Sequence, residues 1–212
     1  MSYTIESIAE CIGARRVGEC EATIDWLLTD SRSLSFPEET LFFALTTKRN
    51  SGARYIPDLY DRGVRNFVVT EEDFEKFKNG ELGKLSTLNF LIVANPLKAL
   101  QKLAEIHREE FKIPIIGITG SNGKTIVKEW LHQLLSPDRR IVRSPRSYNS
   151  QIGVPLSVWQ LNEEAELGIF EAGISEMGEM NALKRMIKPT IGILTNIGGA
   201  HQENFFSLQE KC

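Results

Sequence analysis

The order of hydrophobic and polar positions predicts alternating strands and helices in the second half of the chain. Short apolar runs predict strands over residues 115–119, 141–143, 167–172 and 191–196, and helical spacing predicts helices over 127–135 and 177–187. Such alternation is typical of a parallel sheet with helices on its faces. This half is therefore expected to be an α/β domain built on a parallel sheet.

The first half predicts a smaller mixed α/β domain. Its expected helices cover residues 4–12, 55–62 and 95–111, and its expected strands cover 41–45, 64–69 and 88–93. Asn95 followed by Pro96 is a strong helix start, because asparagine accepts a hydrogen bond from a helix N–H and proline has no N–H to leave unpaired. We place the domain boundary so that the two domains cover residues 1–112 and 113–212.

Two stretches carry specific expectations about burial. In the helix 127–135 the apolar side chains keep i, i+3, i+4 spacing, which predicts burial against the sheet for Val127, Trp130, Leu131, Leu134 and Leu135. Residues 71–86 are charged and lack an apolar stripe, so a solvated peripheral helix or loop is expected there.

The composition is that of a folded globular protein. The 212 residues are 42% hydrophobic and 25% charged with a formal net charge of -3, which argues against a general nucleic-acid binder. No apolar run approaches the ~20 residues of a membrane-spanning helix and the N-terminus lacks a signal peptide, so a cytoplasmic location without membrane insertion is expected. Cys11, Cys20 and Cys212 form no metal-ligand cluster and are expected to be reduced thiols.

The most informative motif runs from Ile113 to Thr125 and reads IPIIGITGSNGKT. An apolar strand leads into a glycine-rich turn whose backbone N–H groups can surround phosphate oxygens at the start of the next helix. The lysine can reach a terminal phosphate, and the threonine hydroxyl can ligate magnesium. Ile118 replaces the first glycine of the standard pattern, so the expected nucleotide-binding residues are Gly120, Ser121, Asn122, Gly123, Lys124 and Thr125. The alternative is an ordinary strand-turn-helix corner with an exposed lysine.

Two other strands end in polar residues, and ligands bind at the carboxyl ends of parallel strands. Glu171, at the end of the strand 167–172, is a candidate magnesium ligand, directly or through water; the alternative is a helix-capping or salt-bridged glutamate. The strand 191–196 ends in Asn196, and a glycine-rich loop then leads to His201. Because ligand-facing groups collect on such loops, we favour a site role for this histidine over a structural one.

A polar loop, SYNSQ at residues 147–151, follows the strand 141–143. Its side chains could orient a substrate or a water molecule at the phosphate site. The preceding arginines could clamp a phosphate or a carboxylate, although alone they are expected to form a solvated face. These arginines are Arg139, Arg140, Arg143 and Arg146.

The motifs TGSNGKT, SYNSQIGVP, EAG and NIGGAHQENF, in this order and at these distances, resemble the central domain of the Mur ligases. The earlier segments TDSR, FFAL and RNSGARYI resemble the substrate domain of the Mur ligase type that adds D-alanyl-D-alanine to UDP-N-acetylmuramoyl-tripeptide. The resemblance covers nearly the whole chain. It also suggests the version fused to a downstream alanine racemase, although these residues contain no racemase sequence.

The resemblance implies an ATP-dependent amide ligase of peptidoglycan synthesis that proceeds through an acyl phosphate. In such an enzyme Lys124 and Asn149 would contact the phosphates, and Thr125, Glu171 and His201 would hold magnesium. The expected catalytic residues are therefore Lys124, Asn149, Glu171 and His201. Contacts to the UDP part of the substrate would come from Ser31, Arg32, Arg49 and Asn50.

The resemblance also implies that the chain is part of a longer enzyme. The carbamylated lysine of the family would fall just past Cys212, and the C-terminal domain that helps to close the ATP site is absent from these residues. We therefore expect a truncated ATPase domain and an inactive fragment. Two alternatives stay open, a ligase similar to folylpolyglutamate synthase and a non-catalytic module that uses ATP as a conformational switch.

Overall fold

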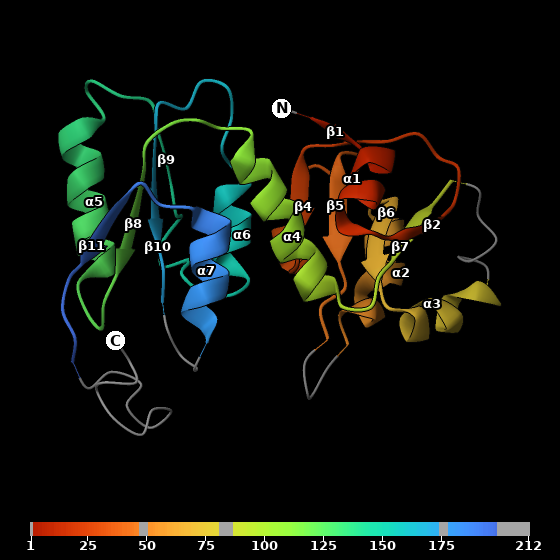
Figure 1. Cartoon of the computed structure of the whole chain (residues 1–212). Coiled ribbons are helices and arrows are strands. Elements are labelled where there is room, and N and C mark those ends of the chain that lie inside the picture. Colours follow the sequence, from red (N-terminus) through yellow and green to blue (C-terminus); the bar gives the residue numbers. More distant parts are fainter. Residues whose placement is uncertain (1, 47–50, 81–86, 174–177, 199–212) are drawn as a thin grey trace. The chain divides into compact units, whose positions relative to one another are not determined.

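The chain divides into two compact units in the computed structural model, Met1–Leu103 and Ala104–Cys212. The structure describes residues 2–46, 51–80, 87–173 and 178–198. The division falls inside helix α4 (Pro96–Glu109), whereas the domain boundary expected from the sequence follows residue 112. Each unit combines helices with a sheet (Figure 1), so the predicted α/β class is confirmed.

The first unit is built on a five-stranded mixed sheet with the strand order β2-β7-β6-β5-β4. Strands β4, β5, β6 and β7 run parallel to one another, and the edge strand β2 pairs antiparallel with β7. Strands β1 and β3 form a separate antiparallel pair. The strands are β1 (Tyr3–Thr4), β2 (Arg15–Val17), β3 (Thr23–Ile24), β4 (Trp26–Leu28), β5 (Thr40–Phe43), β6 (Asn66–Val69) and β7 (Asn89–Ile92). The sequence pattern does not predict β1 to β4, because strands of two or three residues are too short to show alternation.

The helices of the first unit begin and end at recognisable residues. They are α1 (Ile5–Ile12), α2 (Ile56–Asp61), α3 (Glu71–Lys78) and the 3-10 turns η1 (Ser31–Ser33) and η2 (Gly52–Tyr55). Thr4 caps α1 by accepting a hydrogen bond from the Ser7 N–H at 3.2 Å, and Gly13 ends it with a φ of 65°. A left-handed end residue of this kind is usually glycine, because a side chain there is strained.

An aromatic ladder forms the core of the first unit. Phe42, Phe67 and Phe90 lie opposite one another on β5, β6 and β7, and all are almost completely buried. Phe74 of α3 packs edge-on against Phe90, with 5.4 Å between ring centroids, and Phe77 also packs against this core. The peripheral helix expected within residues 71–86 is present as α3. The expectation that it lacks an apolar side is wrong, because its two aromatic side chains, three positions apart, pack against the core.

The second unit is built on a four-stranded parallel sheet with the order β11-β8-β10-β9. Its strands are β8 (Ile115–Thr119), β9 (Ile141–Arg143), β10 (Leu167–Glu171) and β11 (Ile191–Leu194). Its helices are α5 (Lys124–Leu135), α6 (Gly153–Val158) and α7 (Glu179–Ile187). Helix α5 covers one face of the sheet, and α6 and α7 cover the other (Figure 1). All four strands therefore point their carboxyl ends to one edge.

Helix α5 buries less of its apolar surface than the spacing predicts. Val127, Leu131 and Leu135 pack against the sheet, but Trp130 and Leu134 are 63% and 73% exposed. Successive helical residues are about 100° apart, so only one row of side chains can face a sheet directly. The prediction of burial is wrong for Trp130 and Leu134, which lie on the neighbouring row.

Candidate phosphate-binding and magnesium site

The phosphate loop, residues 120–125, follows directly from β8 and requires glycine at two positions. Gly120 and Gly123 have φ values of 132° and 82°, which side chains adopt only with strain. A Cβ at position 120 would also lie 2.1 Å from the Thr195 Oγ1 atom. The glycines that the sequence singles out are thus explained by backbone conformation at both positions, and by close contact with the residues after β11 at the first.

The residues after β11 hold the backbone of this loop. The Asn196 carbonyl accepts a hydrogen bond from the Ser121 N–H, and the Asn196 Oδ1 atom accepts one from the Asn122 N–H, both at 2.9 Å. The Thr195 hydroxyl donates to the Asn122 carbonyl at 2.5 Å. Gly198 exchanges two hydrogen bonds with the Ser121 hydroxyl, at 2.8 and 3.0 Å. The observed contacts of Asn196 are therefore with the loop itself.

Helix α5 begins at the end of the loop, so its N-terminal N–H groups point toward it. The first N–H groups of a helix have no acceptor within the helix, and together with the helix dipole they favour an anion. The Lys124 Nζ atom donates to the Gly120 carbonyl at 2.6 Å and therefore lies against the loop. A glycine-rich loop that leads directly into the N-terminus of a helix is the arrangement expected for phosphate binding.

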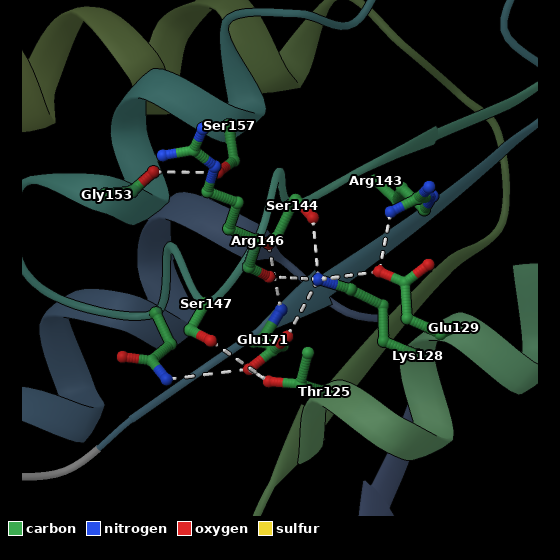
Figure 2. Close-up of polar contacts among 11 residues, drawn as sticks. Thr125, Lys128, Glu129, Arg143, Ser144, Arg146, Ser147, Gly153, Ser157 and Glu171 are labelled. Carbon is green, nitrogen blue, oxygen red and sulfur yellow. Dashed lines mark hydrogen bonds and ion pairs between the residues drawn. The ribbon is translucent and has the colours of Figure 1, made fainter.

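Glu171 at the end of β10 lies beside Thr125 (Figure 2). The Thr125 hydroxyl donates to Glu171 Oε2 at 3.1 Å, and the Asn149 Nδ2 atom approaches the same oxygen at 3.5 Å. The other oxygen, Oε1, lies 2.9 Å from the Lys128 Nζ atom but makes no hydrogen bond of good geometry. Glu171 is thus salt-bridged, as the structural alternative supposed, and one of its oxygens still faces the predicted site.

The loop after β9 brings Asn149 to the end of β10. The Gly173 N–H donates to the Asn149 carbonyl at 2.8 Å, and the Glu171 N–H donates to the Ser144 hydroxyl at 3.1 Å. The Ser147 hydroxyl lies 3.3 Å from that of Thr125. Among the arginines before this loop, Arg140 pairs with Glu166 and Arg143 with Glu129, as expected of a solvated face.

The oxygen donors at this point suit magnesium. A threonine hydroxyl and a buried carboxylate oxygen at 3.1 Å are the hard ligands that Mg²⁺ takes, and a nucleotide normally supplies further oxygens. The described residues contain no group of three His, Cys, Asp or Glu side chains that could hold a metal by themselves. Any magnesium bound by Thr125 and Glu171 would therefore also need ligands from phosphate or water.

The remaining predicted site residues either fall outside the described residues or belong to the first unit. His201, Arg49 and Asn50 are outside the described residues. Ser31 is buried in the first unit, where its carbonyl accepts a hydrogen bond from Arg62 Nη1 at 2.8 Å. Arg32 is exposed and donates two side-chain N–H groups to Asp30, which lowers the pKa of that carboxyl group. Ser31 and Arg32 both belong to the first unit, and these contacts are with residues of that unit.

Three further residues shape the site without being predicted from the sequence, namely Lys128, Ser144 and Thr195. Lys128 is fully buried and pairs with Glu171. A signal for it exists, because position 128 shares the sheet-facing side of α5 with Leu131 and Leu135 at i, i+3 and i+7 spacing. A lysine on an apolar face needs a buried acceptor. The two hydroxyl residues follow strand ends but belong to no recognisable motif.

Comparison with known proteins identifies close similarity to one class of ligase. Residues 118–211 match the family described as the Mur ligase middle domain. The chain is 44% identical over 207 residues to the UDP-N-acetylmuramoyl-tripeptide--D-alanyl-D-alanine ligase of Treponema pallidum, which covers 95% of this chain and 44% of the relative. It is 36% identical over 194 residues to the ligase of the same name from Borreliella burgdorferi, covering 89% and 41%.

Solved structures agree with this similarity. The fold matches MurF from Acinetobacter baumannii with a TM-score of 0.84 at 23% identity, over all of this chain and 45% of the other. MurF ligase from Thermotoga maritima, solved in complex with ADP, matches with a TM-score of 0.72 at 26% identity, over 87% of this chain and 40% of the other. The chain thus spans less than half the length of these relatives. No helix in the described ranges is long and apolar enough to cross a membrane.

Proposed function

We propose that this chain, which belongs to the Mur ligases through its middle domain at residues 118–211, is part of an ATP-dependent amide ligase. The reaction adds D-alanyl-D-alanine to UDP-N-acetylmuramoyl-tripeptide, as the names of the relatives state for those proteins. ATP phosphorylates the terminal carboxylate of the tripeptide, and the amine of the dipeptide then displaces phosphate from the acyl phosphate. Because the chain spans 44% of the Treponema pallidum relative, ligation is proposed for the complete protein.

The observation that carries this proposal is the position of Glu171 beside the phosphate loop. Its Oε2 atom lies 3.1 Å from the Thr125 hydroxyl, although the two residues are 46 positions apart. A simple phosphate-binding corner needs no buried carboxylate at this point. A ligase that transfers a phosphoryl group does need one, because charge develops on phosphoryl oxygens and cations must be held against it.

Each site residue has a proposed role. The loop residues Gly120 to Gly123 and the start of α5 surround the phosphates, and Lys124 contacts the terminal phosphate. Thr125 and Glu171, with His201, hold magnesium, and Asn149 assists at the phosphates. The bound magnesium would supply positive charge that polarises the phosphoryl group. Asn196 keeps the loop in shape, through the two hydrogen bonds that it accepts.

The first unit is proposed to bind the UDP part of the substrate through Ser31, Arg32, Arg49 and Asn50. The remaining partners are D-alanyl-D-alanine and C-terminal domains of the same polypeptide. A cytoplasmic location and a fused alanine racemase stay predictions. The alternatives are a folylpolyglutamate synthase-like ligase and an ATP-driven switch, and ligand binding distinguishes them.

Substrate class is tested by isothermal titration of the 212-residue chain with UDP-N-acetylmuramoyl-tripeptide and, separately, with folate. We expect heat of binding with the UDP ligand and none with folate. Binding of folate alone would favour the folylpolyglutamate synthase-like alternative. Nucleotide binding without a response to either compound would favour the switch module.

Lys124→Ala tests the phosphate loop. We expect the affinity for ADP to fall about 10- to 100-fold, because one charge-assisted hydrogen bond to phosphate is lost. In the complete protein, turnover should be abolished. Lys184→Ala, which removes an exposed lysine of α7, is the matched control and should bind ADP like the wild type. Unchanged ADP affinity in Lys124→Ala would contradict the assignment of the loop.

A further inference from the structure

Lys128 places a buried ammonium group beside two carboxylates and two backbone carbonyls. Its side chain is fully buried in α5, and its Nζ atom lies 2.9 Å from Glu171 Oε1. The same atom donates to the Ser144 carbonyl at 2.8 Å and to the Arg146 carbonyl. The Glu129 Oε1 atom also lies 3.3 Å from this ammonium group. The contact with Glu171 Oε1 is an ion pair rather than a hydrogen bond of good geometry.

Glu171 and the two carbonyl groups belong to two segments that carry proposed site residues. Glu171 ends β10, and Ser144 and Arg146 lie in the loop after β9 that leads to Asn149 (Figure 2). Arg146 has a φ of 49°, a left-handed conformation that is strained for a residue with a side chain. Its carbonyl points to Lys128 in this conformation, so the lysine stabilises the turn just before Ser147 and Asn149.

The two oxygens of Glu171 contact different groups, and Lys128 contacts only one of them. Oε1 lies at the ammonium group, and Oε2 accepts from the Thr125 hydroxyl at 3.1 Å. One carboxylate oxygen is therefore directed to the phosphate loop. A single carboxylate oxygen suits Mg²⁺, which usually binds one or two carboxylates together with phosphate oxygens and water.

Stability alone does not account for the ion pair. Both side chains are fully buried, so each has lost its hydration. Replacing a buried ion pair by apolar side chains of similar volume is often neutral or stabilising. The pair is therefore better explained by the positions that it imposes on its neighbours.

We propose that Lys128 is a positioning residue for the magnesium site. It turns one oxygen of Glu171 toward Thr125 and fixes the loop 144–149 so that Asn149 reaches the same oxygen. This inference rests on the proposed function, since it gives a purpose to the carboxylate that the ligase would use. Lys128 itself would touch neither nucleotide nor substrate.

The first test measures the position of the loop without any ligand. In the Lys128→Met chain we expect the Gly173 amide, which donates to the Asn149 carbonyl, to exchange its hydrogen at least about tenfold faster, the factor that one charge-assisted hydrogen bond corresponds to. The Ala172 amide is an internal control, because it donates to the Ile118 carbonyl within the sheet at 2.8 Å and should keep its rate. Equal protection of Gly173 in variant and wild type would overturn the proposal.

The second test measures the response to magnesium. ADP is titrated into the wild type and into Lys128→Met, once with excess Mg²⁺ and once with a chelator. The ratio of the dissociation constants with chelator and with Mg²⁺ is then compared between the two proteins. We expect Lys128→Met to lose about tenfold or more of the strengthening by Mg²⁺, as is typical when a residue behind a metal ligand is removed. Its affinity for ADP without Mg²⁺ should match the wild type, because the phosphate loop is untouched. An unchanged ratio would overturn the proposal.

Two further proteins separate the possible failures. Arg185→Met, which breaks an exposed pair with Glu105, should behave like the wild type in both tests. If Lys128→Met does not fold, the Lys128→Met/Glu171→Met chain removes both buried charges, and its Gly173 amide should still exchange faster than that of the wild type. If Mg²⁺ does not change the ADP affinity of the wild type, the result counts against the proposed function. The hydrogen-exchange test then still decides whether Lys128 positions the loop.

Discussion

Gly173 allows the Asn149 side chain to lie against the end of β10. A Cβ at this position would lie 2.8 Å from the Asn149 Oδ1 atom, closer than real contacts allow. The glycine of the EAG motif is therefore explained by a neighbour 24 positions earlier in the sequence. Such a reason cannot be found from the local pattern, because it depends on which loop the fold brings to the strand.

Gly173→Ala should displace Asn149 while the sheet stays folded. We expect the free energy of unfolding to fall by about 1–3 kcal/mol through overpacking, and turnover of the complete protein to fall with it. Gly192→Ala is the control, because nothing lies within 4 Å of a Cβ there and the two variants make the same change. Urea denaturation and turnover are the measurements. Equal behaviour of the two variants would contradict the described contact.

Helices and strands with several apolar positions could be predicted from the sequence, whereas short ones could not. The strands β8 and β10 and the helix α4 appear where the pattern places them. Helix α6 was not predicted, because its six residues, GVPLSV, are too few to show a helical repeat of apolar positions and include a proline. The glycine-rich turn between β8 and α5 was predictable from its own residues, and its binding of phosphate stays a prediction. The pairing of Lys128 with Glu171 was not predictable, because it joins two residues 43 positions apart.

Helix α5 provides a test of how burial is divided along one element. Trp130→Gln should change the free energy of unfolding by less than about 0.5 kcal/mol, because the ring is 63% exposed. Leu131→Ala should lower it by about 1–2 kcal/mol, because this side chain packs against the sheet. Urea denaturation of both variants is the measurement. A larger effect for the tryptophan would show that its row of α5 is covered.

At the scale of the whole molecule, His107 makes folding depend on pH. It lies in α4 within the second unit, where its Nε2 atom is 3.0 Å from the Leu161 carbonyl and its ring lies 4.6 Å from that of Trp159. Burial lowers the pKa of this histidine from 6.5 to about 4. The unfolded chain therefore binds a proton more readily than the folded chain at mildly acidic pH.

We expect the stability of the second unit to fall as the pH decreases from about 6.5 to 4 and to be insensitive to this histidine above that range. The pKa difference corresponds to a loss of up to about 3 kcal/mol. Urea denaturation at pH 7 and pH 5, followed by tryptophan fluorescence, to which Trp159 contributes, measures it. In His107→Gln this component of the pH dependence should be absent, and an identical pH profile in both chains would refute it.

The bonds between the phosphate loop and the end of β11 have a consequence for how the protein is made. Asn122 and Asn196 are 74 positions apart, so the loop lacks these partners until the chain has been synthesised past β11. Closing contacts over such a separation is slow compared with forming local turns and helices. A nascent chain on the ribosome would therefore gain its proposed nucleotide affinity late, only after residues 195–198 have left the exit tunnel.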